Sequence, residues 1–186
     1  MNYRLEVEGA PEEVPGGTNI LLLHRSTDDT DRIDIQFLLK DTDHYLVIST
    51  RTTAKEIDEK LEFFEVDRKA ATIIDAISIE RGYSRRESDR VEYLTGPDDI
   101  DGLVSAATTF FDSHTGKVRL SMDSISELAF YSSEDRALEA VDALCDLVVE
   151  HDAVSLFHLA TEVHDESFVS RVESQFDLVL NIDEID

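Results

Sequence analysis

The chain has 186 residues, and its 42 acidic against 17 basic side chains give a formal net charge of −25. This length and a hydrophobic fraction of 41% predict one folded domain over residues 1–186, with an edge segment at 1–18 and a core at 19–182. The charge argues against a nucleic-acid partner, because phosphate groups are neutralised by a basic surface. The one basic cluster, which Glu80, Glu87 and Asp89 interrupt, consists of Arg81, Arg85, Arg86 and Arg90.

Acidic residues are spread along the whole chain, and only 5 of the basic residues are lysines, a pattern typical of adaptation to high salt. In molar salt the Debye length is about 3 Å, so repulsion among these charges is screened. We therefore expect a cytoplasmic protein of a halophilic archaeon. The sequence has no signal-peptide pattern and no apolar run long enough to span a bilayer, so no membrane partner is expected. The single cysteine, Cys145, excludes an intrachain disulfide and is expected to be buried.

In the first half of the chain, a buried strand is predicted at residues 19–23 and a helix pattern begins near Asp31. A second strand is predicted at 44–49, and a capping box formed by Thr53 and Glu56 then opens a helix with apolar side chains on one face. Residues 71–75 are predicted as a third strand, 78–89 as a polar loop and 91–94 as a small strand.

In the second half, the clearest helix pattern covers residues 100–111 after a cap at Asp98 or Asp99. A strand is predicted at 118–122, a long helix capped within 132–135, a strand at 153–158, a helix through 168–172 and a last strand at 176–182. Apolar strands that alternate with amphipathic helices predict an α/β fold with a mainly parallel central sheet and helices on both faces. A receiver-like α/β fold with Asp75 as phospho-acceptor ranks second.

Polar residues that follow the strands define a candidate site. In open α/β sheets, ligands bind beyond the carboxyl ends of the strands. The candidates are His24, Arg25, Ser49, Thr50, Asp75, Asp123, Ser124 and His158.

Residues 118–123 (Val-Arg-Leu-Ser-Met-Asp) and the following Ser-Ile-Ser-Glu-Leu resemble the Walker B segment of RecA-like ATPases. The KaiC-type group is particularly similar, because its strand ends in Asp-Ser and leads into a helix. The chain also resembles haloarchaeal transducer-like proteins with degenerate RecA-like domains, through residues 157–165 and 176–180. The resemblance covers about residues 17–182 and implies a RecA-like P-loop NTPase fold. It also implies that Asp123, with Ser124, is a Walker-B-like Mg²⁺ ligand.

Two departures from that pattern argue against ATP hydrolysis. A P-loop needs G-x-x-x-x-G-K-[ST], whereas residues 24–31 are His-Arg-Ser-Thr-Asp-Asp-Thr-Asp, without glycine or lysine. A carboxylate about 4 Å from a phosphate charge costs ~4 kcal/mol at a surface-like dielectric. We expect Asp28, Asp29 or Asp31 to cap the following helix instead. The catalytic glutamates of KaiC-type ATPases are also missing, because residues 49–53 are Ser-Thr-Arg-Thr-Thr.

The sequence therefore favours a non-catalytic pseudo-ATPase that acts as a regulatory or signalling module through a protein partner or self-association. No cofactor is expected. The vestigial cleft is expected to contain His24, Arg25, Ser49, Thr50 and His158. The alternatives are a divergent ATP-binding protein or ATPase that uses Asp123 for Mg²⁺, and a small-ligand sensor that uses the cleft.

A metal site is not predicted from the histidines. His158 and His164, with Asp165 adjacent, have a six-residue spacing, whereas zinc sites prefer closer pairs with further ligands. His158 is expected to be a polar residue with satisfied hydrogen bonds that lines the cleft. Asp123 is expected to bond the turn that follows its strand.

Overall fold

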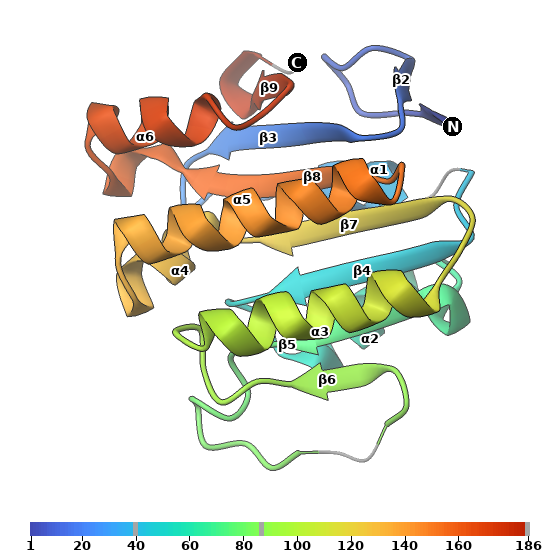
Figure 1. The fold of residues 1–186 in the computed structure, drawn as a ribbon, viewed down its shortest axis with the longest axis vertical. Helices are drawn as coiled ribbons and strands as arrows, with labels where there is room; N and C mark the ends of the chain where they lie inside the picture. Colours follow the sequence, from blue (N-terminus) through green and yellow to red (C-terminus); the bar gives the residue numbers. More distant parts are fainter. Residues whose placement is uncertain (39–40, 86–87, 185–186) are drawn as a thin grey trace.

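The computed structural model describes residues 1–38, 41–85 and 88–184, which form a single layered α/β unit (Figure 1). Its centre is a seven-stranded sheet with the order β6-β5-β4-β7-β8-β3-β9, and every neighbouring pair is parallel. The strands are β3 (Thr18–His24), β4 (His44–Ser49), β5 (Ala71–Asp75), β6 (Val91–Tyr93), β7 (Val118–Asp123), β8 (Val154–Ala160) and β9 (Leu178–Asn181). The predicted α/β class with a parallel sheet is confirmed.

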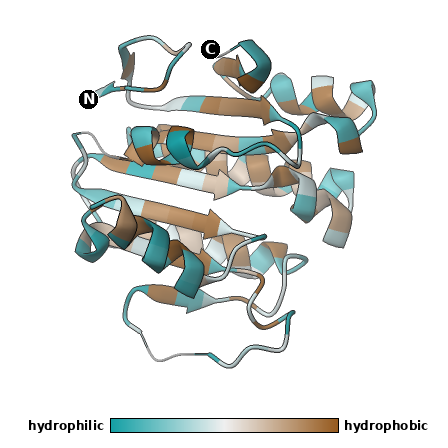
Figure 2. Cartoon of the chain, turned by 180° about the vertical axis from the view of Figure 1, so that it is seen from behind, coloured by the Kyte–Doolittle hydropathy of each residue, from teal (hydrophilic) through white to brown (hydrophobic). Residues whose placement is uncertain are grey.

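Helices cover both faces of this sheet. One face packs against α3 (Ile100–Ser113), α4 (Ile125–Tyr131), α5 (Glu134–Glu150) and α6 (Glu166–Glu173) through one large apolar cluster. The other face packs against α1 (Asp31–Leu38) and α2 (Ala54–Phe63) through a second cluster. Figure 2 shows apolar strands between helices whose outer faces are hydrophilic. Two-sided burial explains why the central strands are continuous apolar runs.

Residues 1–17 form a small unit beside the main sheet. Strands β1 (Asn2–Arg4) and β2 (Glu13–Pro15) pair with each other in antiparallel fashion. The ring of Tyr3 is fully buried, and its hydroxyl donates to the carbonyl of Asp152 at 3.0 Å and accepts from the amide of Val118 at 3.1 Å. The segment thus extends the second apolar cluster with its own buried side chains, which are Tyr3, Leu5, Val7 and Val14.

Local signals in the sequence account for the starts of α2, α3 and α5. Both hydrogen bonds of the predicted capping box between Thr53 and Glu56 are present at the start of α2. Asp99 caps α3 and Ser133 caps α5, each through a side-chain oxygen that accepts a backbone N–H. In the predicted polar loop, the described residues 78–85 and 88–89 form no helix or strand, while Arg86 and Glu87 lie outside the described residues.

The predicted strand ends differ from the observed ones at the candidate site. Strand β8 runs two residues beyond His158, to Ala160, and β3 includes His24 as its last residue. These histidines are therefore residues of the sheet itself and not the first residues of loops.

Cys145 is buried as predicted. Burial, and to a smaller extent the charge of Asp142, raises the pKa of its thiol to about 12.

Across the described ranges, we find no helix with the length and apolar character needed to cross a membrane.

Candidate functional site

Three adjacent strands present polar side chains on one face near their carboxyl ends. The strand β8 lies between β3 and β7, with Leu22 paired to His158 and Ser121 paired to Leu156. Side chains two residues apart in a strand point to the same face. His24, His158 and Asp123 therefore gather on the face that α1 and α2 cover, although up to 134 positions separate them in the sequence.

These three residues form a compact cluster. One ligand atom from each of them, a ring nitrogen or a carboxylate oxygen, lies within 4.8 Å of the other two. The rings of His24 and His158 meet edge to face, with centroids 5.3 Å apart. His24 is 3% exposed and His158 is 0% exposed, whereas the Asp123 side chain is 27% exposed. The cluster is thus buried on the histidine side and reaches solvent on the carboxylate side.

Asp34 of α1 fixes the ring of His158 through a hydrogen bond. The Nε2 of His158 lies 2.7 Å from Oδ1 of Asp34, and Lys60 of α2 approaches Oδ2 of Asp34 at 3.4 Å. Burial lowers the pKa of His158, but the charge and hydrogen bond of Asp34 outweigh it, so the pKa is raised. Burial raises the pKa of Asp34, but His158 and Lys60 lower it more strongly. Asp34 therefore stays ionised against a fixed imidazole.

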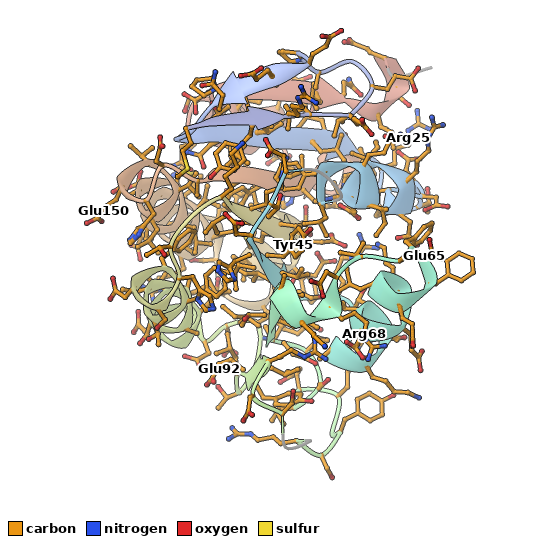
Figure 3. All side chains as sticks on the ribbon, turned by 90° about the vertical axis from the view of Figure 1, so that its right-hand side faces the viewer. Arg25, Tyr45, Glu65, Arg68, Glu92 and Glu150 are labelled. Atoms are coloured by element: carbon orange, nitrogen blue, oxygen red, sulfur yellow. The ribbon has the colours of Figure 1, made fainter. Side chains whose placement is uncertain are left out.

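His24 is held differently. Its Nδ1 lies 2.7 Å from the carbonyl oxygen of Arg25. Burial is the main cause that lowers the pKa of its ring, and the neighbouring His158 lowers it further. His24 is thus a neutral imidazole at neutral pH. The side chain of Arg25 itself is exposed and points outward from the end of β3 (Figure 3), so it does not line the predicted cleft.

The connection between β3 and α1 is a closed turn. The amide of Arg25 donates to the carboxylate of Asp28 at 2.7 Å, and the amide of Asp28 donates back to the carbonyl of Arg25. The amide of Asp31 donates to Asp29, so an aspartate stands at the start of α1 as predicted. The amide and hydroxyl of Ser26 both donate to Glu162, at 2.7 and 2.5 Å. A phosphate loop presents backbone amides to its ligand, whereas four amides of this turn are bound to the protein's own oxygens.

Asp123 and Ser124 differ from their expected environments. Asp123 receives a long contact from Nη1 of Arg51, at 3.5 Å, and faces the two histidines, not the following turn. The peptide between Asp123 and Ser124 is cis. The Ser124 hydroxyl donates to Glu127, while its amide donates to the hydroxyl of Thr50 at 2.8 Å. Both Thr50 and Ser124 are buried, so they hold the backbone of β4 and β7 together.

Ser49 and Asp75 also serve the scaffold. The hydroxyl of Ser49 accepts from the amide of Thr52 at 2.9 Å. Asp75 is fully buried and accepts four hydrogen bonds, from the amides of Ala54, Ile77 and Ser78 and from the Ser78 hydroxyl. A phospho-acceptor must be reachable by its donor, so the receiver-like alternative for Asp75 does not fit.

His158 and His164, whose spacing does not favour a metal pair, have separate partners. His164 places Nε2 3.0 Å from the hydroxyl of Ser126 and packs its ring on Phe168, while His158 bonds to Asp34. The actual partner of His158 is His24, which lies on the neighbouring strand. The missed signal is that an ionisable residue lies at or near the carboxyl end of each of the three strands on the same face, as His24 in β3, Asp123 in β7 and His158 in β8.

A shallow groove lies over the carboxyl ends of the strands, with a volume of about 460 Å³. Arg51 and Arg81 supply its positive charge, while Phe130, Tyr131 and Val163 form an apolar rim. Phe130 is 82% exposed and Val163 57% exposed. The groove thus combines arginines with exposed apolar side chains, a composition that is enriched in protein interfaces.

Comparisons with known proteins fit the fold. Protein PH0250 from Pyrococcus horikoshii OT3 superposes with a TM-score of 0.63 at 10% identity, covering 91% of this chain and 83% of that one. The uncharacterized P. horikoshii protein PH0321, whose crystal structure is in complex with an unknown peptide, has a TM-score of 0.63 at 16% identity, covering 90% and 78%. No curated protein matches the chain. A family profile matches all of residues 1–186, and the chain therefore belongs to the family of unknown function DUF7090.

Proposed function

We propose that this protein is a non-catalytic RecA/KaiC-like pseudo-ATPase that acts as a regulatory or signalling module by binding another protein or a second copy of itself. The observation that carries the proposal is the closed turn after β3. Its amides at Arg25, Ser26 and Asp31 are bound to Asp28, Glu162 and Asp29. A nucleotide phosphate would have to displace these carboxylates and then remain near them, which opposes binding by ~4 kcal/mol for each close contact.

The chemistry opposite Asp123 supports the same conclusion. His24 and His158, both buried, lie opposite Asp123, and residues 24–31 contain no lysine. Burial and the neighbouring ring hold the pKa of His24 down, so it supplies no positive charge at neutral pH. Mg²⁺ binding in nucleotide sites depends on phosphate oxygens and a partner hydroxyl, and the Ser124 hydroxyl is bonded to Glu127.

The groove above the strands supports a protein ligand. An 82% exposed phenylalanine is costly in water, and Phe130 stands next to Tyr131 and Val163 on one rim. Aromatic and arginine side chains dominate the energetic centres of protein interfaces. The similarly folded PH0321 protein was crystallised with a peptide, which is consistent with peptide recognition on this type of scaffold.

Calorimetry with ATP in molar KCl tests the pseudo-ATPase assignment. We expect no heat of binding at millimolar ATP, with or without Mg²⁺, because the amides of the turn are already occupied. A matched control is the Asp28→Asn chain, which removes one carboxylate charge from the turn but leaves Glu162 and Asp29 in place. Mg²⁺-dependent ATP binding by the unaltered chain, lost in Asp123→Ala, would establish the divergent ATPase instead.

That alternative rests on one specific observation. Arg51 and Arg81 both line the groove, and Arg51 also contacts Asp123. Two guanidinium groups could neutralise phosphates without a P-loop lysine. If the unaltered chain binds ATP and the Arg51→Met and Asp123→Ala chains each lose that binding, this mode is supported. If none of the three chains binds ATP, the pseudo-ATPase is supported.

Partner binding is tested on the apolar rim. A partner retained by the tagged chain in molar KCl is expected to be released by Phe130→Ala and kept by Phe63→Ala. Phe63 is a matched control because it is 79% exposed on α2, which packs against the opposite face of the sheet. Retention of the partner by both variants would contradict an interface at this groove.

A further inference from the structure

Two ring nitrogens in the site are buried without a partner. Within residues 1–38, 41–85 and 88–184, Nε2 of His24 and Nδ1 of His158 have no hydrogen-bond partner. A buried polar atom that makes no hydrogen bond costs ~1–3 kcal/mol. Their residues belong to the same cluster with Asp123. Two such atoms beside one carboxylate form a set of groups that a ligand between them could satisfy.

The hydrogen bond of the second nitrogen in each ring determines the tautomer, and so whether the unpartnered nitrogen carries a proton. Nδ1 of His24 lies 2.7 Å from a carbonyl oxygen, which can only accept, so this nitrogen carries the proton. Nε2 of His158 lies 2.7 Å from the ionised Asp34 and likewise carries a proton. In the neutral rings, the two orphaned nitrogens are therefore lone-pair donors, the form in which imidazole binds a metal.

Asp123 completes a three-ligand set. Arg51 approaches only Oδ1 of Asp123, which leaves Oδ2 for another partner. Three ligands about 2.1 Å from a tetrahedral ion stand ~3.4 Å apart, so ligand atoms that lie within 4.8 Å of one another need to approach by at most ~1.4 Å. We propose that His24, His158 and Asp123 bind one divalent first-row transition-metal ion of the Zn²⁺ type. This inference goes beyond the proposed function and does not depend on it.

The surroundings resemble the outer shell of a metal site. A histidine that ligates a metal usually donates its other N–H to a carboxylate or a backbone carbonyl, which sets its tautomer and orientation. Asp34 does this for His158, and the carbonyl of Arg25 does it for His24. Asp34 is itself fixed by Lys60. Neither outer group is a ligand, so each acts as a positioning residue.

The donor set also selects the kind of ion. Imidazole nitrogens favour Zn²⁺, Fe²⁺, Co²⁺, Ni²⁺ and Cu²⁺ over Mg²⁺, which prefers oxygen ligands. Three protein ligands leave a fourth position open. A cavity of about 50 Å³, which Asp123 and Asp34 line but neither histidine does, lies beside the cluster and has room for a water molecule. An open position of this kind is typical of reactive rather than purely structural metal sites.

The test is metal binding by the full chain after treatment with a chelator, in molar KCl. We expect calorimetry to give one Zn²⁺ per chain, no response to Mg²⁺, and visible d–d absorption when Co²⁺ is the probe. Asp123→Asn is the informative variant, because this partly exposed residue can change without a cavity. We expect it and His24→Gln to weaken Zn²⁺ binding at least tenfold, and Asp34→Asn to weaken it about 10- to 100-fold.

The matched control is His114→Gln. His114 and His44 form the other close histidine pair of the described structure, with ring centroids 4.5 Å apart, and binding there would be a surface effect. We expect this variant to bind Zn²⁺ like the unaltered chain. Absence of Zn²⁺ binding, binding lost in His114→Gln, or binding unchanged in a folded Asp123→Asn chain would each overturn the proposal. Circular dichroism of each variant establishes that it is folded.

Discussion

Removing salt is the strongest perturbation that the structure predicts. The folded chain exposes 9127 Å² and carries a net charge of −25. Dividing the area by the charge gives one net charge per about 365 Å², so neighbouring charges stand ~19 Å apart. That spacing is shorter than the Debye length of ~30 Å at 0.01 M salt and much longer than the ~3 Å at 1 M.

The magnitude follows from these distances. Two unit charges ~19 Å apart in water repel by ~0.2 kcal/mol, and about half of this survives at 0.01 M salt. Over roughly 75 neighbouring pairs, the folded state carries ~9 kcal/mol of repulsion at 0.01 M and almost none at 1 M. Unfolding spreads the charges apart and relieves most of it. Since an ordinary domain is stable by about 5–15 kcal/mol, removal of salt is expected to unfold the chain or bring it close to unfolding.

Thermal unfolding followed by circular dichroism measures this effect across a KCl series from about 0.01 to 1 M, over which the Debye length falls from ~30 to ~3 Å. We expect the midpoint to rise steeply at low salt and then to level off, because the screening is nearly complete once the Debye length falls well below the charge spacing. A midpoint that stays flat over this range would refute the reasoning.

A charge variant separates screening from general salt effects. Replacing six exposed acids by their amides lowers the net charge to about −19, and because repulsion scales with the square of charge, the salt-dependent part falls to about 60%. Exchanging Asp and Glu at the same positions keeps the charge and is expected to keep the full dependence. The positions are Glu12, Glu92, Asp112, Asp142, Asp146 and Glu150.

Four further predictions concern local structure. Thr53→Ala removes one side of a capping box and is expected to cost about 1 kcal/mol in urea unfolding. Hydrogen bonds from Thr53 lower the pKa of Glu56, so the ionised carboxylate stabilises the fold above the usual pKa of 4.5, and this stabilisation is lost as pH falls through the lowered pKa. The free energies of unfolding of Glu56→Gln and the unaltered chain are therefore expected to converge at that low pH. A difference between them that does not change with pH would contradict this. Phe157→Ala, at a fully buried position, is expected to cost about 3–5 kcal/mol, whereas Phe130→Ala should leave the urea midpoint unchanged. Tyr3→Phe removes two hydrogen bonds of a buried ring and is expected to cost about 1–3 kcal/mol; an unchanged midpoint would show that the N-terminal unit contributes little.

The secondary structure was predictable where a local signal determines it. Residues 44–49 and 71–75 are strands with the predicted ends, because continuous apolar runs flanked by polar residues fit a sheet buried on both faces. The start of α2 follows from Thr53 and Glu56 alone, since a capping box is completed within four residues. Strands β1 and β2 were not predicted, because three-residue strands offer too little alternation to detect.

The site was only half predictable, because its geometry is set by strand order. That polar residues would stand near the carboxyl ends of strands follows from the α/β class. Which of them meet depends on β8 lying between β3 and β7, and no local pattern specifies that order. His24 and His158 were therefore named separately and not as a pair. Asp34 was missed because it lies one turn inside a helix and reaches the sheet only after α1 has packed.

The position of β3 has a consequence for synthesis of the chain. Thr18 pairs with Val154 and Ile20 pairs with Leu178, 136 and 158 positions further along. At about 5–20 residues per second, a ribosome needs ~7–27 s to make the nearer partner. During this interval a seven-residue strand that is fully buried in the finished fold has both edges unpaired. Such distant pairing makes folding slow, and repulsion between negatively charged nascent chains opposes pairing of that strand with other chains during this interval.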